Sequence, residues 1–136
     1  MKMTDQITSH PLDTPSTDIL IGNSFPLSLI RRSVSIDPFP TDELRLHLEN
    51  ARLHSFWGHE NTLHAASQWL GVDLAPKTER PVVVLSDDGL PQLDSLIFNE
   101  CFILSPDYRL GFRPVIGAEV ASEDIISWTV LKITWK

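Results

Sequence analysis

Short apolar runs that alternate with helix-like segments constrain the fold of this chain most strongly. Three of the runs are followed by turn-forming segments, at Gly22-Asn23, Pro38-Phe39-Pro40 and Asp87-Asp88-Gly89, as strands closed by turns are. The predicted strands span residues 19–21, 34–36, 81–85, 96–104 and 128–135. Because helical segments lie between them and no internal repeat is visible, the pattern predicts an α/β fold with a mixed sheet and flanking helices. The length of 136 residues fits a single small domain.

The first helix is expected after the Pro38-Phe39-Pro40 break. Thr41 is suited to cap it, and Leu44 and Leu48 then share one face. Leu44, Leu46 and Leu48 also alternate, so a strand is the competing interpretation.

The second helix is expected to begin near His59. It places Leu63, Ala66 and Leu70 on one face and ends at Gly71, where a C′ glycine belongs. Near the end of the chain, Ser122 is suited to cap a short helical turn before the terminal strand.

The domain boundaries follow from the apolar pattern. Residues 1–17 carry Thr, Ser, Asp and Pro with isolated apolar residues and no period, so we expect a flexible N-terminal extension. Residues 18–136 are expected to form the folded domain.

Composition and charge exclude several classes of protein. The formal charge of -7 disfavours a coat for long nucleic acid, although a local pocket can still hold a few phosphates. No apolar stretch approaches the ~20 residues that span a bilayer, and no apolar block follows Met1-Lys2 as in a signal peptide, so neither membrane insertion nor secretion is expected. The single cysteine, Cys101, has no disulfide partner and fits a cytoplasmic protein.

Several enzyme signatures are missing. No P-loop, dinucleotide fingerprint or nucleophile elbow is present. Cys101 lies within an apolar strand candidate and is expected to be a packed core thiol. His54, His59 and His64 are five residues apart, which scatters them over different helix faces, so no metal site is expected. At least three of the four tryptophans are expected in core or dimer packing rather than base stacking.

His59 is the residue around which chemistry is expected. A histidine at a helix N-terminus lies beside unpaired backbone N–H groups and the positive end of the helix dipole, which attract phosphate. Its imidazole could then hydrogen-bond a phosphoryl or leaving oxygen. A structural or surface histidine remains the alternative.

Several segments together resemble the viral ring nucleases of the type III anti-CRISPR group. Their order and spacing match over residues 19–86, and a weaker echo spans residues 113–119, where the family commonly has Arg-Leu-Pro-Glu-Gly-Ala-Glu. The matching segments are Ile21-Gly22-Asn23-Ser24-Phe25, Ser55-Phe56-Trp57-Gly58-His59-Glu60-Asn61-Thr62, Leu70-Gly71-Val72 and Arg80-Pro81-Val82.

The resemblance implies a small α/β homodimer that binds cyclic tetra-adenylate across its two-fold axis. It implies metal-independent and cofactor-free cleavage of this second messenger, which suppresses type III CRISPR signalling. Matched position by position, the resemblance gives His59 the general-acid role and implies that Gly58, Glu60 and Asn61 at the helix entry supply backbone donors to the ligand. Asn23 and Ser24 are implied to lie on a loop that contacts the ligand. Arg80 and Arg113 are implied to lie near the ligand or to structure the site.

Two departures from the family pattern remove polar chemistry. Ile116 stands where the family commonly has a catalytic Glu, and Pro26 stands where a serine is often found. Glu119 or Glu100 could supply a carboxylate instead. A binding protein that sequesters the same messenger without cutting it, and a protein-interaction domain with no nucleotide ligand, are the alternative functions.

Overall fold

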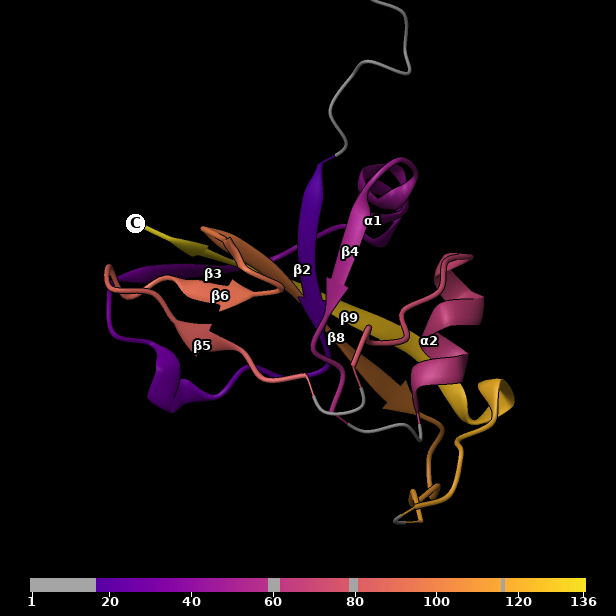
Figure 1. Ribbon diagram of the computed structural model, residues 1–136. Helices are drawn as coiled ribbons and strands as arrows, with labels where there is room; N and C mark the ends of the chain where they lie inside the picture. Colours follow the sequence, from indigo (N-terminus) through magenta and orange to yellow (C-terminus); the bar gives the residue numbers. More distant parts are fainter. Residues whose placement is uncertain (1–16, 59–61, 79–80, 116) are drawn as a thin grey trace, which may run out of the picture.

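A five-stranded mixed sheet forms the centre of the chain (Figure 1). The structure, a computed structural model, describes residues 17–58, 62–78, 81–115 and 117–136. The strand order is β3-β9-β8-β2-β4, in which β2 runs parallel to β4 and β8, and β9 runs antiparallel to β8 and β3. The bounds are β2 Asp18–Gly22, β3 Val34–Pro38, β4 Arg52–Ser55, β8 Glu100–Tyr108 and β9 Ile125–Trp135.

Helices and a second sheet cover the two faces of the main sheet. Figure 1 shows α1 (Thr41–Leu48) and α2 (Leu63–Leu70) in the right half of the view and β5 and β6 in the left half. The second sheet has the order β5-β6-β7, with β5 Val84–Leu85, β6 Pro91–Leu93 and β7 Leu96–Ile97. Two 3₁₀ turns, Leu27–Leu29 and Ser122–Asp124, complete the described elements. The expected α/β fold with a mixed sheet and flanking helices is confirmed.

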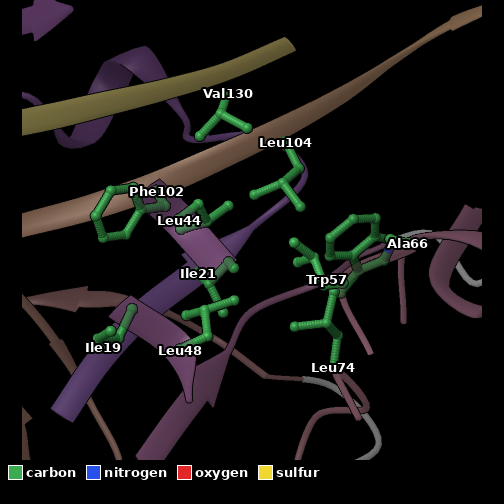
Figure 2. Close-up of a cluster of buried hydrophobic side chains, with 11 residues drawn as sticks. Ile19, Ile21, Leu44, Leu48, Trp57, Ala66, Leu74, Phe102, Leu104 and Val130 are labelled. Atoms are coloured by element: carbon green, nitrogen blue, oxygen red, sulfur yellow. The ribbon is translucent and has the colours of Figure 1, made fainter. Parts of the chain in front are cut away.

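Alternate residues of the central strands fill two separate cores. Ile19 and Ile21 of β2 pack with the α1 and α2 side chains, whereas Leu20 between them packs with the second sheet. Figure 2 shows the first cluster, in which Phe102 and Leu104 of β8 meet Leu44 of α1. Since side chains of a strand alternate between faces, a strand buried on both sides reads as a continuous apolar run.

The first helix forms as predicted, because its apolar residues recur at helical spacing. Leu44 and Leu48 are buried whereas Leu46 is exposed, which excludes the alternating strand. Asp42 and Glu43 lie in the first turn, where they oppose the positive end of the helix dipole. The expected cap was wrong by one residue: Pro40 is the N-cap and Thr41 is the first helical residue.

The second helix ends as predicted and its start is only partly described. Gly71 adopts φ +74°, the left-handed conformation of a C′ glycine, and its N–H donates to the Ser67 carbonyl. The described helix begins at Leu63 with Thr62 as its N-cap. The predicted start at His59 lies outside the described residues.

The strand predictions around residues 81–104 were partly wrong. Residues 81–85 do not form a buried strand, because only Val84–Leu85 pair and the side chains of Val82 and Val84 are exposed, although Val83 is buried. The segment 96–104 is not one strand. It divides at Phe98-Asn99 between β7 of the second sheet and β8 of the main sheet.

Strand β4 and the cap of the turn at Ser122–Asp124 also differ from the sequence-based prediction. β4 was not predicted, since Arg52–Ser55 is neither continuously apolar nor regularly alternating. The 3₁₀ turn at Ser122–Asp124 forms, but Ala121 rather than Ser122 is its N-cap.

The four tryptophans all pack within the chain. Trp57 and Trp135 are buried in the two cores, and Trp69 stacks on Trp128 with ring centroids 5.2 Å apart. The expected packing role of at least three of them is confirmed.

Cys101 is a core thiol, as expected. It lies on β8 between Leu20 of β2 and Ile133 of β9 and is fully buried. Burial, with a smaller contribution from the nearby Glu100 charge, raises the pKa of the Cys101 thiol to about 12.

We expect Cys101 to react with a thiol reagent at about pH 8 roughly 10²-fold more slowly in the native chain than in urea, because the thiolate is the nucleophile. The pKa of the Cys101 thiol in the folded chain lies above its ordinary value of 9.0. The native state should therefore also lose stability as the pH rises from 9.0 towards about 12. Absorbance of the released thiolate dye measures the rate. Equal rates in buffer and in urea would contradict the packing of β8.

Candidate functional site

Two segments of the predicted site meet at the carboxyl edge of the parallel strands β2 and β4. Ile21 pairs with Ser55, and the Phe56 N–H donates to the Ile21 carbonyl at 3.0 Å. One step beyond the strands, the Gly58 N–H donates to Asn23 Oδ1, also at 3.0 Å. Parallel pairing therefore joins the Asn23 segment to the Gly58 segment across 35 positions of sequence.

Gly22 makes this approach possible. A Cβ at Gly22 would lie 2.4 Å from Cε2 of Phe56, which is closer than real Cβ contacts come. Because Phe56 is buried in the second core, its ring has little room to move aside. Glycine at the end of β2 thus allows the ring to lie directly against the strand that leads to Asn23.

Two neighbouring cavities lie beside Gly58 and the start of α2. The first, of about 290 Å³, is lined by Trp57, Gly58 and the segment Ala75-Pro76-Lys77-Thr78. The second, of about 450 Å³, is lined by His64, Ser67, Asp73, Gly117 and Glu119. Leu63 and Ala75 line both, so the two cavities adjoin. Together they place one ammonium, one imidazole and two carboxylates around a hollow at the end of β4.

The predicted site residues are placed unevenly. Asn23 is half-buried and Ser24 and Gly58 are exposed at the carboxyl edge. Arg113 is exposed in the segment between β8 and β9, and no hydrogen bond among the described residues joins it to Asn23 or Gly58. His59, Glu60, Asn61, Arg80 and Ile116 lie outside the described residues.

The Gly58 N–H is already engaged. It was expected to serve as a backbone donor to the ligand, but its hydrogen bond goes to Asn23 Oδ1. Gly58 and Asn23 therefore hold the two segments of the predicted site together.

Glu119 and Glu100, the two carboxylates considered as substitutes at the site, lie in different surroundings. Glu100 begins β8, at the amino end of the parallel strands, and forms an ion pair with Lys132 at 3.3 Å. Glu119 lines the 450 Å³ cavity with His64. Only Glu119 is near the edge where Asn23 and Gly58 meet.

A polar cluster around the buried His54 was not predicted from the sequence. His54 of β4 contacts Asp18 of β2 through Nε2 and Asp94 of the β6–β7 turn through Nδ1, both at 2.8 Å. Arg52 also donates two hydrogen bonds to the Asp18 carboxylate. The hydrogen bonds from Arg52, and then that from His54, hold the pKa of Asp18 below its usual value. Nothing in the sequence pairs these residues, because 36 and 40 positions separate them from His54.

Within the described parts of the chain, no group of three His, Cys, Asp or Glu side chains is arranged to hold a metal ion. Over the same residues, no helix has both the length and the apolar character needed to cross a bilayer.

Replacing Asn23 by Ala should remove the acceptor of the Gly58 N–H and destabilise the chain by about 0.5–1.5 kcal/mol, the net value of a hydrogen bond. Urea unfolding measures the stability, and amide exchange at Gly58 reports the local effect. The matched variant Asn23→Asp keeps an oxygen acceptor and should protect Gly58 about as well as the parent chain does. If Gly58 exchanges equally fast in all three proteins, the bond is not formed in solution.

The chain was compared with known proteins. No protein-family model matches it, and no curated protein matches it either. The features that point to a function are therefore the motif segments and the geometry of the carboxyl edge.

Proposed function

We propose that the protein is a ring nuclease that cleaves cyclic oligoadenylate, with cyclic tetra-adenylate as the favoured substrate. In this proposal it acts in the host cytoplasm, and cleavage of the messenger suppresses type III CRISPR signalling. The observation that carries the proposal is the hydrogen bond between Asn23 and Gly58. It joins two segments that resemble ring-nuclease motifs at the carboxyl edge of parallel strands, where α/β proteins commonly bind ligands. Gly58 directly precedes His59, the proposed general acid.

The proposed reaction needs few protein groups, because the substrate carries its own nucleophile. A ribose 2′-OH attacks the adjacent phosphorus, the bond from phosphorus to the 5′ oxygen breaks, and a 2′,3′-cyclic phosphate remains. The 2′ oxygen loses its proton to a base, and His59 gives a proton to the departing 5′ oxygen. The protein must only align these atoms and neutralise the charge of the phosphorane.

The cationic groups near the site support an anionic ligand despite the net charge of -7. Lys77 lines the cavity beside Gly58, with its side chain about three-fifths exposed. Arg80 and Arg113 are the further cations that the motif resemblance assigns to the ligand. Two copies of this site in a homodimer would match a ring of even symmetry.

A messenger-binding protein without nuclease activity is the second candidate. Ile116, at the position of a common catalytic Glu, favours it, because an apolar side chain cannot accept the 2′-OH proton. Incubation with a panel of cyclic oligoadenylates separates the candidates. Linear product supports the nuclease, and tight binding without product supports the binding protein. If the protein neither binds nor cleaves any of the rings, the protein-interaction domain is the candidate that is left.

Replacing His59 by Ala should lower cleavage roughly 10²- to 10⁴-fold, as loss of a general acid does. Binding should largely survive, because phosphate contacts come from other groups. Single-turnover cleavage measures the rate and a thermal melt checks the fold. The His47→Ala variant, at an exposed histidine of α1 outside both cavities, is the matched control. Undiminished cleavage by the His59 variant would remove this residue from the mechanism.

EDTA should leave the cleavage rate unchanged, because each step of the proposed reaction is assigned to the substrate or to protein side chains. Chromatography of products with and without chelator provides the measurement. Loss of cleavage in EDTA, followed by recovery on adding a divalent ion, would refute a metal-independent reaction.

Glu119 is the proposed base for the 2′-OH proton, because it lines the same 450 Å³ cavity as His64, whereas Glu100 forms an ion pair with Lys132. Glu119→Gln should reduce cleavage roughly 10²-fold, since an amide cannot accept the 2′-OH proton. Glu100→Gln is the matched control and should cleave at the parent rate. The assignment fails if the two variants have the same activity.

A further inference from the structure

The cluster around His54 joins three parts of the chain. His54 is about 3% exposed and lies on the edge strand β4. Asp18 is the first residue of β2, and Asp94 lies in the turn between β6 and β7. The ring of Phe98, which follows β7, lies 5.4 Å from the imidazole centroid. The imidazole is therefore a polar link between the main sheet and the second sheet.

The number of ring protons decides whether both contacts hold. A neutral imidazole has one N–H donor and one lone pair, whereas an imidazolium has two N–H donors. Both nitrogens face carboxylate oxygens at 2.8 Å, and an ionised carboxylate can only accept. Arg52 helps to keep Asp18 ionised. Both contacts are therefore hydrogen bonds only while His54 carries two ring protons.

The turn that carries Asp94 is strained. Asp94 and Ser95 have φ values of +54° and +66°, so two successive residues other than glycine are left-handed. This is the geometry of a tight hairpin turn, which glycine or asparagine adopts more easily. A bond from the Asp94 side chain to the main sheet helps to hold such a turn in place.

We propose that His54 is a proton-dependent latch that fastens the β6–β7 hairpin to the main sheet. Four charged groups face the latch: Asp18 from β2, Arg52 from β4, Asp94 from the hairpin turn and Lys77 from the segment after α2. Loss of one ring proton would leave a nitrogen of His54 with a lone pair facing a carboxylate and so weaken the latch. As the pH falls through the lowered pKa of Asp18, the contact to β2 is lost.

The His54 latch is also connected to the candidate site through Lys77. Lys77 Nζ lies 3.7 Å from Asp94 Oδ2, and Lys77 lines the cavity beside Gly58. Release of the hairpin would move Asp94 away from this ammonium. The proposal itself does not depend on the ring-nuclease function.

Two measurements on the full chain between about pH 5 and 9, the range in which histidines change charge, test the latch. Nitrogen-15 NMR of the imidazoles should show both ring nitrogens of His54 protonated in the lower part of this range. Amide exchange, corrected for intrinsic rates, reports how often the hairpin opens at Phe98. This opening should become roughly tenfold more frequent when His54 loses a ring proton, which is the effect of losing one charge-assisted hydrogen bond. The amide of Phe102 in the main sheet should keep its protection.

Asp94→Asn provides the matched variant, because asparagine accepts the left-handed turn but carries no charge. Its hairpin should open more readily at low pH, and the dependence on pH should shrink to about twofold or less. His64→Gln, a change at an exposed histidine, should behave as the parent chain. A singly protonated His54 throughout the range, or equal loss of protection at Phe98 and Phe102, would overturn the latch.

Discussion

Burial of β2 on both faces and both edges is the constraint on which the rest of the structure depends. Leu20 and Ile21 are fully buried, on opposite faces, and the strand pairs in parallel with β4 on one side and β8 on the other. Parallel neighbours need long connections that return the chain to the same end of the sheet. These crossovers contain α1 before β4, and α2 with the second sheet before β8. The same geometry brings the segments after β2 and β4 together.

The edge strand β4 is held at both ends by polar contacts with the β2 side of the sheet. At its amino end, Arg52 and His54 bind Asp18, and beyond its carboxyl end Gly58 binds Asn23. His54 also contacts Asp94 of the second sheet, and the bond between Gly58 and Asn23 joins the two motif segments. Because β4 lies at the edge with one strand neighbour, these contacts add to the limited hydrogen bonding of a short strand. The stability of β4 and the geometry of the candidate site are therefore connected.

Sequence reasoning succeeded where local pattern and final environment agree. The helical spacing of Leu44 and Leu48 and the C′ glycine at Gly71 are local signals, and both helices formed where these signals indicated. It failed for residues 96–104, because an apolar run does not reveal that its two halves belong to different sheets. β4 was missed because pairing with β2, rather than its own composition, makes Arg52–Ser55 a strand.

The sequence by itself determined the α/β class, both helical segments, the core position of Cys101 and the motif segments that contain Asn23 and Gly58. These depend on spacing along the chain and on how much apolar surface each segment must bury. Only the tertiary structure decided that Asn23 bonds Gly58, that Glu119 rather than Glu100 lies beside the cavity, and that His54 joins Asp18 to Asp94. Hydrogen bonds between residues tens of positions apart depend on strand register and crossover direction, which the pairing of β2 sets and no local pattern encodes.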